Sequence, residues 1–260
     1  MKSNEGRIVG PASVQELERS KGEFVPSEVT RVYPKITEVP TRYNRKAVVI
    51  LSGGMDSTTL LYDVLRQMEE VYPISFHYGQ KHNREVNSAF DTCQKLGLPF
   101  KSLQIPLGLV APSSLTSKDT DIPKGHYEDE SMKQTVVPNR NMVFISFATA
   151  YAIGLGAEEV YYGAHGGDHA IYPDCRPEFV DAMGDVMRLC DYKEIKLQVP
   201  YLYWTKADIL KRGTELGVDY SLTWTCYEGK ELDCGKCGAC AERLEAFRDV
   251  GVEDPIKYKD

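Results

Sequence analysis

"VVILSGGMDSTTLLYDVL", residues Val48–Leu65, is the stretch that decides the fold. An apolar run rich in valine ends at Ser52-Gly53-Gly54, and apolar residues then recur at helical spacing as far as Met68. The pattern predicts a strand, a tight turn and a helix. Such a turn can cradle a phosphate, because glycines let backbone N–H groups approach an anion at the start of a helix. An ordinary strand-to-helix turn without a ligand is the alternative, and the glycines alone favour the two interpretations equally.

One acidic residue sets this turn apart from a Walker A loop. The Lys-Ser/Thr pair that ends such a loop is missing, and Asp56 stands among the small residues. A carboxylate repels a phosphate, so we expect Asp56 to face a cation or to cap the helix. The hydroxyls of Ser52 and Ser57 add hydrogen-bond donors to the turn.

The alternation of strand and helix continues along the chain. Helical periodicity predicts a helix after Gly54, and a long polar loop separates the third strand from the next helix. Strands that alternate with helices need crossover connections, so we predict an α/β fold with a doubly wound, mostly parallel five-stranded sheet. Ligands bind beyond the carboxyl ends of such strands. The predicted strands are residues 46–51, 70–79, 100–105, 158–164 and 195–201, the further helices 86–96, 141–152, 177–189 and 206–216, and the loop 106–138.

Composition and charge narrow the class of protein. The chain has 260 residues and a formal net charge of -7. An acidic chain is a poor candidate for gripping a nucleic-acid backbone, so we expect no nucleic-acid partner. No apolar run reaches the roughly 18 residues that a membrane helix needs, and the N-terminus lacks the apolar core of a signal peptide. We therefore expect a cytoplasmic protein without a membrane partner.

Three segments follow from these patterns. Residues 1–45 are polar, carry four prolines and show no clear period beyond a short candidate helix near 14–20, so we predict an N-terminal extension of unreadable role. Residues 46–220 form the predicted nucleotide-binding domain. Residues 221–260 form a predicted metal-binding C-terminal segment that packs on it.

Four of the seven cysteines crowd into that last segment with the spacing C-x7-C-x2-C-x2-C. In a chain without a secretion signal, thiolate ligands are a better interpretation than disulfides. Four thiolates suit one tetrahedral Zn²⁺ and leave no open position for a substrate, so we predict one structural zinc ion per chain. An iron–sulfur cluster is the main alternative, and four unligated thiols are the other. The ligands would be Cys226, Cys234, Cys237 and Cys240.

The string of strand, Ser-Gly-Gly-x-Asp-Ser and helix resembles the signature of the PP-loop ATP pyrophosphatases, which split ATP between its α- and β-phosphates. The resemblance implies a Rossmann-like fold of the adenine nucleotide alpha hydrolase type, ATP as co-substrate, and Mg²⁺ near Asp56. A lysine must then come from elsewhere, and Lys206 in "WTKADIL" is the candidate; a solvated helix lysine is its alternative. The loop residues expected to hold ATP are Leu51, Ser52, Gly53, Gly54, Met55, Asp56 and Ser57.

Further motifs narrow the family. The chain contains, in order, "YGQKHNREV", "VPNRNMVFISFA", "YPDCRPEF", "TKADI", "LGVDYSLTWTCYEG" and "CGKCGACAERLEAF". Over residues 46–258 these motifs closely resemble the 7-cyano-7-deazaguanine synthase family, which makes the nitrile precursor of queuosine and archaeosine.

The family resemblance implies a reaction in two halves. ATP adenylates the carboxylate of 7-carboxy-7-deazaguanine, and ammonia displaces AMP to give the amide. A second ATP then activates the amide oxygen for dehydration to the nitrile. Free ammonia or a separate amide donor is implied, because no glutaminase domain fits in this length. Homodimers are frequent in the family.

The resemblance also suggests residues for the pocket. Arg140 in "VPNRN" joins Lys206 and Asp56 as a catalytic candidate, with a surface ion pair as its alternative. A deazaguanine edge calls for an acid and its ring for an aromatic surface, and Arg176 can hold a carboxylate with two hydrogen bonds. The substrate-binding candidates are Tyr78, Gln80, Asp168, Tyr172, Asp174, Arg176 and Phe179; the candidates for proton transfer are His77, His82, Glu85, His165 and His169.

The ordinary alternatives are that the aromatic residues belong to the core and that Asp174 pairs with Arg176. Cys175, between Asp174 and Arg176, has the surroundings of a nucleophile. The implied mechanism is complete without a covalent thiol, so we favour a packing or pocket-wall role for it.

Two features depart from the family pattern: the roughly 45 residues before the first strand and the histidine-rich "YGAHGGDHAIYPD". They keep open an enzyme that stops at the amide, or one that attaches a deazaguanine to a protein. Two other classes are a tRNA sulfur transferase on the same scaffold and a zinc-ribbon binding module with a vestigial loop. The first calls for a catalytic cysteine pair and a basic surface, and the second predicts ATP binding without pyrophosphate release.

Overall fold

Five parallel strands form one sheet in the computed structural model, which describes residues 43–117, 119–125 and 130–259. Their order across the sheet is β3-β2-β1-β4-β5, and each neighbouring pair among them is parallel. The predicted parallel five-stranded sheet is therefore confirmed. Residues 1–42 of the predicted N-terminal extension, with its candidate helix, lie outside the described residues, and the last three residues of the extension, 43–45, begin the first strand instead. The strands are β1 (Tyr43–Ile50), β2 (Met68–His77), β3 (Lys101–Gln104), β4 (Glu159–Tyr161) and β5 (Lys196–Gln198).

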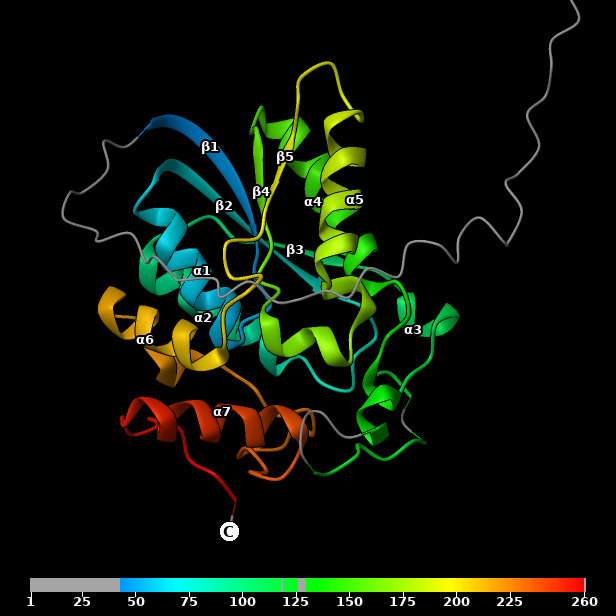
Figure 1. Ribbon diagram of the computed structural model, residues 1–260, viewed down its shortest axis with the longest axis vertical. Helices are drawn as coiled ribbons and strands as arrows, with labels where there is room; N and C mark the ends of the chain where they lie inside the picture. Colours follow the sequence, from blue (N-terminus) through cyan, green and yellow to red (C-terminus); the bar gives the residue numbers. More distant parts are fainter. Residues whose placement is uncertain (1–42, 118, 126–129, 260) are drawn as a thin grey trace, which may run out of the picture. The chain divides into compact units, whose positions relative to one another are not determined.

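Helices connect the strands (Figure 1). Gly97 and Gly217 end α2 and α6 in the left-handed conformation, with φ of 65° and 71°. None of the described helices is both long and apolar enough to cross a membrane. The α-helices are α1 (Met55–Leu65), α2 (Arg84–Leu96), α3 (Leu107–Val110), α4 (Arg140–Leu155), α5 (Pro177–Arg188), α6 (Lys206–Leu216) and α7 (Gly238–Val250); the short 3-10 helices are η2 (Glu130–Thr135), η3 (Gly166–Ala170), η4 (Pro173–Cys175) and η5 (Tyr220–Leu222).

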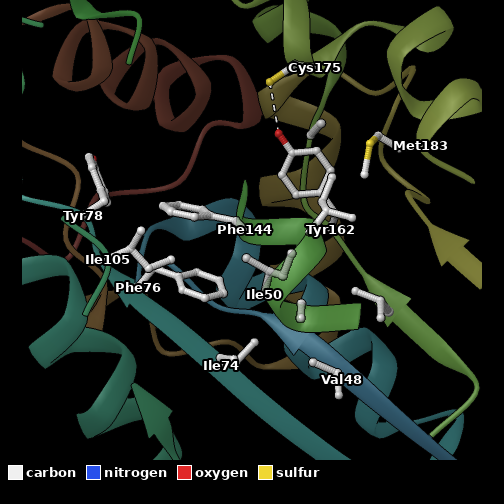
Figure 2. Close-up of a cluster of buried hydrophobic side chains, with 14 of the residues drawn as sticks. Val48, Ile50, Ile74, Phe76, Tyr78, Ile105, Phe144, Tyr162, Cys175 and Met183 are labelled. Atoms are coloured by element: carbon white, nitrogen blue, oxygen red, sulfur yellow. Dashed lines mark hydrogen bonds between the residues drawn. The ribbon is translucent and has the colours of Figure 1, made fainter. Parts of the chain in front are cut away.

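Helices cover both faces of the sheet. Alternate residues of a strand point to opposite faces, so neighbouring residues of β1 pack in different clusters. Val48 and Ile50 of β1 pack in a cluster with α4 and α5, part of which Figure 2 shows. Val49 and Leu51 pack in a second cluster with α1, α2 and α6. The doubly wound arrangement is confirmed, and it leaves the carboxyl ends of the strands as the open edge.

Two predictions about elements are wrong in part. Met68, which the helical spacing placed on the face of the first helix, begins β2 instead, because α1 ends at Leu65 with Arg66 as its C-cap. Met68 is still buried, in the cluster below α1. The segment predicted as the polar loop 106–138 contains α3 and η2.

The C-terminal segment packs on the sheet domain through α7. Ala246 and Phe247 of α7 join Leu210 of α6 in a third apolar cluster. Arg243 is completely buried, and its Nε and Nη2 pair with the Asp254 carboxylate at 2.8 and 2.9 Å. This buried pair fixes α7 against the chain that follows it. The predicted boundary near residue 220 stays a prediction.

Candidate functional site

A cavity of about 210 Å³ opens at the carboxyl ends of the strands. Its walls come from the loop after β1, the starts of α2, α4, α6 and α7, and the segment that follows β4. The strand order reverses between β1 and β4, which is the point where open α/β sheets bind ligands. The sequence-predicted loop and the predicted lysine both line this one cavity.

The loop between β1 and α1 depends on Gly53. Its φ of 92° is a conformation that residues with a Cβ rarely adopt. A Cβ there would also lie 2.0 Å from the Glu85 carbonyl oxygen and 2.9 Å from the Ala89 nitrogen of α2. The Gly53 carbonyl accepts a hydrogen bond from the Trp224 N–H at 3.0 Å. The loop is thus clamped between α2 and the start of the C-terminal segment.

The hydroxyls of Ser52 and Ser57 close the loop on itself. They lie 2.9 Å apart, and the Ser57 hydroxyl also accepts the Ser52 N–H at 3.1 Å. The Gly54 N–H donates to the Ser52 hydroxyl at 3.2 Å. This ring of short contacts holds polar groups at the positive end of α1, where an anion is favoured.

Lys206 reaches the loop from far along the chain. It is the first residue of α6, where Thr205 and Asp208 form a capping box that fixes the helix start. Its Nζ lies 3.2 Å from Asp56 Oδ2 and 2.7 Å from Glu242 Oε2, and only 11% of its side chain is exposed. Burial opposes the charge, but the carboxylates of Asp56 and Glu242 outweigh it and raise the pKa of Lys206. The lysine is therefore a buried, permanent cation at the loop.

Asp56 keeps one oxygen for another partner. Burial acts to raise its pKa, but Lys206 and His165 outweigh burial, so the pKa of Asp56 is lowered and the group is ionised. Its Oδ1 is buried and accepts no hydrogen bond from the described residues. A buried carboxylate oxygen without a partner fits a hard cation such as Mg²⁺.

His165 lies between two acids behind the loop. Its Nδ1 accepts the Gly167 N–H at 3.1 Å, so Nε2 is the nitrogen that carries a proton. That Nε2 lies 3.8 Å from Asp56 Oδ2 and 3.6 Å from Asp168 Oδ2. The residue is 1% exposed and lines the cavity. His165 therefore helps to position both acids.

Arg140 contributes a second cation. It starts α4 directly after Asn139, which has a φ of 62° and is the one residue other than glycine with positive φ in the described chain. The Asn141 N–H donates to Asp174 Oδ2 at 3.0 Å, which ties this turn to η4. The guanidinium carbon lies 5.8 Å from the Tyr78 ring centroid and 5.7 Å from the Tyr172 ring centroid. The predicted surface ion pair of Arg140 is not among the interactions of the described residues.

Glu85 is an acid of the cavity with a pKa near neutral pH. It lies on the first turn of α2, beside Gly53, and lines the cavity. Burial raises the pKa of Glu85 to about 7, although the Arg140 charge acts to lower it. A carboxyl group with this pKa can both accept and give a proton near neutral pH.

The predicted substrate residues divide into two groups. Tyr78, Asp168 and Tyr172 line the cavity. Burial raises the pKa of Tyr78 to about 12, so its hydroxyl stays protonated. Among the candidates for proton transfer, Glu85 and His165 line the cavity, and His77, His82 and His169 do not.

The other substrate candidates lie outside the cavity lining. The Gln80 amide bonds the backbone of its own turn, accepting from Tyr78 N at 2.8 Å. Asp174 caps the start of α4, and Arg176 Nε donates to the His169 carbonyl at 2.9 Å. Phe179 packs against the core on α5. The alternative of an Asp174–Arg176 pair does not occur as an ion pair among the described residues.

Cys175 forms part of the cavity wall. Figure 2 shows its sulfur beside the Tyr162 hydroxyl. Its Sγ lies 3.2 Å from the Tyr162 hydroxyl and 3.3 Å from Asn141 Nδ2. Burial raises the pKa of this thiol, so the thiolate that a nucleophile requires is disfavoured. The geometry agrees with the predicted wall role.

The four clustered cysteines converge as their spacing predicts. Their Sγ atoms all lie within 4.8 Å of one another, and all four residues are buried. Backbone N–H groups point at the sulfurs, including Cys234 N to Cys226 Sγ at 3.3 Å and Cys237 N to Cys234 Sγ at 3.2 Å. Such bonds stabilise thiolates, and four thiolates at this separation fit a tetrahedral metal ion. The cluster is a candidate metal centre, with Zn²⁺ as the predicted occupant.

Sequence reasoning missed several residues of the cavity. Glu242 lies only two positions after Cys240, but an acid on a helix surface carries no signal of its own. Its role depends on the packing of α7 against α6, which a sequence without known contacts does not reveal. Phe144, Tyr162 and Trp224 also line the cavity and lie in motifs quoted above.

The chain is similar in sequence to known proteins over most of its length. A 7-cyano-7-deazaguanine synthase from Methanoregula boonei is 61% identical over 215 residues, which cover 82% of this chain and 99% of that protein. One from Caldicellulosiruptor saccharolyticus is 60% identical over 215 residues, covering 82% and 96%. A solved structure that matches at 15% identity is that of the U34-tRNA thiolase NcsA from Methanococcus maripaludis with its 4Fe-4S cluster. The match has a TM-score of 0.45 and covers 80% of this chain and 65% of that one.

The family assignment rests on a match that spans the whole site. The family described as "Queuosine biosynthesis protein QueC" matches residues 46–251. That range contains the loop at 52–57, the buried Lys206 and all four clustered cysteines. The chain therefore belongs to the queuosine biosynthesis protein QueC family.

Proposed function

We propose that this protein is a 7-cyano-7-deazaguanine synthase. The carboxylate oxygen of 7-carboxy-7-deazaguanine attacks the α-phosphorus of ATP, and pyrophosphate leaves. Ammonia attacks the acyl carbon, loses a proton, and displaces AMP to give the amide. The amide oxygen attacks a second ATP, pyrophosphate leaves again, and loss of AMP and of the remaining N–H protons gives the nitrile. The observation that carries the proposal is the loop-and-lysine pair in one cavity with aromatic walls, in a chain 61% identical to such a synthase.

The loop residues 51–57 and Lys206 would serve both ATP cleavages. The N–H groups and hydroxyls at the start of α1 bind the leaving pyrophosphate, and Lys206 neutralises its growing charge. Asp56 would hold Mg²⁺ through its free Oδ1. The ion, when bound, supplies further positive charge at the phosphates.

The rings of Tyr78 and Tyr172 would stack on the flat deazaguanine, and Asp168 would accept from its N1–H and 2-amino edge. Four predicted substrate residues do not line the cavity, so they would affect the substrate only through neighbouring residues. They are Gln80, Asp174, Arg176 and Phe179.

The four cysteines would hold a structural Zn²⁺, for which a reducing compartment such as the cytoplasm is suited. Free ammonia is the proposed nitrogen source, and the proposed partners are small molecules, without nucleic acid or membrane. A homodimer stays a prediction.

The mass of the product tests the proposed function. The protein is incubated with 7-carboxy-7-deazaguanine, Mg²⁺-ATP and an ammonium salt, and the product is analysed by mass spectrometry. We expect the nitrile, with two AMP and two pyrophosphate formed for each. Accumulation of the amide with one AMP would move the protein to the amide-forming enzymes. Absence of AMP with every component present would refute the assignment.

Glu85 is proposed to accept the proton that ammonia loses, so its replacement should change the pH profile. In the wild type, amide formation should rise with pH as Glu85 ionises around pH 7. Glu85→Gln should remove this limb and slow amide formation by about 100-fold, since general bases contribute roughly 10²–10⁴-fold. The rates are compared at equal concentrations of free ammonia, because that fraction also rises with pH.

An independent measurement of Glu85 is the free energy of unfolding. The pKa of a solvated glutamate is 4.5 and that of Glu85 in the folded chain is about 7, so the folded state binds more protons between these values. The contribution of Glu85 to the free energy of unfolding of the wild type therefore falls as pH rises through that window. Glu85→Gln should gain stability relative to the wild type as pH rises from about 5 to about 8. A constant difference across that range would contradict the assigned burial of this carboxyl.

A further inference from the structure

Arg140 is a cation that the phosphate chemistry does not require. The proposed phosphate site already has Lys206, held between Asp56 and Glu242. Arg140 lies on a different element, α4, and its neighbours are aromatic rings rather than the serines and glycines of the loop. Both cations open into the same cavity. The second cation therefore calls for a second anion.

The guanidinium is charged and lacks a fixed counter-ion in the described part of the chain. No carboxylate of the described residues forms an ion pair with Arg140, and its Nε donates to the neutral Asn141 Oδ1 at 3.2 Å. The acids whose charges reach it are Glu85 and Asp174. Asp174 Oδ2 is engaged with the Asn141 N–H, and Glu85 is half protonated near neutral pH. A partly buried cation that has no ion-paired carboxylate among the described residues favours a bound anion.

The surroundings of Arg140 are built to hold it in place. Asn139 adopts a left-handed backbone conformation directly before it, with a φ of 62°, which fixes the direction in which α4 begins. The next residue, Asn141, is tied to Asp174 and to Cys175. The guanidinium then lies near the rings of both Tyr78 and Tyr172. A flat heterocycle that stacks on either ring would bring a substituent to the guanidinium.

We propose that Arg140 binds the 7-carboxylate of the substrate and thereby selects the acid for the first adenylation. This inference rests on the proposed function, and it moves to Arg140 the role that the sequence suggested for Arg176. The guanidinium offers two parallel N–H donors to a carboxylate. After the first half of the reaction the substrate is a neutral amide, and this attraction is lost. Arg140 is then a specificity-determining residue for the first half-reaction and not for the second.

The test compares the binding of two defined ligands without ATP. Calorimetry measures the Kd of 7-carboxy-7-deazaguanine and of 7-amido-7-deazaguanine for the wild type and for Arg140→Gln. The wild type should bind the acid at least about 10-fold more tightly than the amide. Arg140→Gln should weaken acid binding by about 10- to 100-fold, as expected for hydrogen bonds to a charged group, and amide binding by less than about 3-fold.

Rates give a second readout with the same ligands. Single-turnover AMP formation from the acid should fall in Arg140→Gln, while AMP formation from the amide stays near the wild-type rate. Arg248→Gln, a change of an exposed arginine on α7, is the matched control and should alter neither. Circular dichroism checks that each variant is folded.

Several outcomes would overturn the inference. Equal affinity of the wild type for the acid and the amide would overturn the inference. This result needs no variant, so the inference can be tested even if the Arg140→Gln protein does not fold. Equal losses for both ligands would assign Arg140 to the ring or to the scaffold. A raised KM for ATP with both ligands would assign it to the phosphates. A wild type that binds the acid selectively but forms no AMP would keep Arg140 as the carboxylate receptor and refute the proposed function instead.

Discussion

Lys206→Met should lower the rate of AMP formation by about 100- to 1000-fold, which is the usual cost of removing one group that stabilises developing charge. Lys206 is the buried cation of the loop, and its Nζ lies between Asp56 and Glu242. Without it, the cluster keeps its negative charges and repels the pyrophosphate that must leave. The rate is measured with saturating substrate and Mg²⁺-ATP as pyrophosphate release.

The matched control for this change is Lys211→Met, because Lys211 is an exposed lysine on the same helix. We expect it to keep the wild-type rate. Both acyl adenylation and amide dehydration should be slowed by Lys206→Met, since one loop serves both. A loss of less than about 5-fold would show that Lys206 is a charge partner of Asp56 and Glu242 without a role at the phosphates.

Cys237→Ser should remove the metal centre and most of the order of the C-terminal segment. Structural zinc contributes on the order of 10 kcal/mol to the folding of small zinc domains. Loss of even several kcal/mol from the segment that clamps Gly53 through Trp224 should lower Tm by on the order of 10 °C. The measurements are the zinc content by elemental mass spectrometry and the Tm by calorimetry.

Cys190→Ser is the control for the cysteine prediction, because Cys190 is exposed and lies outside the cluster. It should retain one zinc per chain and the wild-type Tm. A full complement of zinc in Cys237→Ser would contradict the four-thiolate site. Iron and sulfide in the wild type, in place of zinc, would instead identify the cluster as an iron–sulfur centre.

Most of the fold was predictable because it depends on local periodicity. The strand positions follow from short apolar runs, and α2 and α6 end at glycines that adopt positive φ. The wrong assignment of Met68 shows the limit of that signal. A buried methionine after a helix continues the helical spacing whether or not the helix has ended. The sequence pattern therefore does not show that the helix ends at Arg66.

The site was predictable where a residue acts through its own motif. The loop and the four cysteines fall in this group, and so does Lys206 at a helix start. The pocket was harder, because an arginine's partner depends on where its neighbours fold. Arg140 and Arg176 have similar sequence surroundings, yet the structure turns Arg140 toward the cavity and Arg176 toward the His169 carbonyl. Only three-dimensional packing separates them.

The first two turns of α7 join two parts of the molecule that differ in chemistry. Cys237 caps this helix, Cys240 lies one turn further, and Glu242 contacts the ammonium of Lys206. A shift of α7 at the cysteines would therefore also change the contact between Glu242 and the Lys206 ammonium. Loss of the predicted zinc ion would therefore alter the charge around Lys206 in the candidate nucleotide pocket.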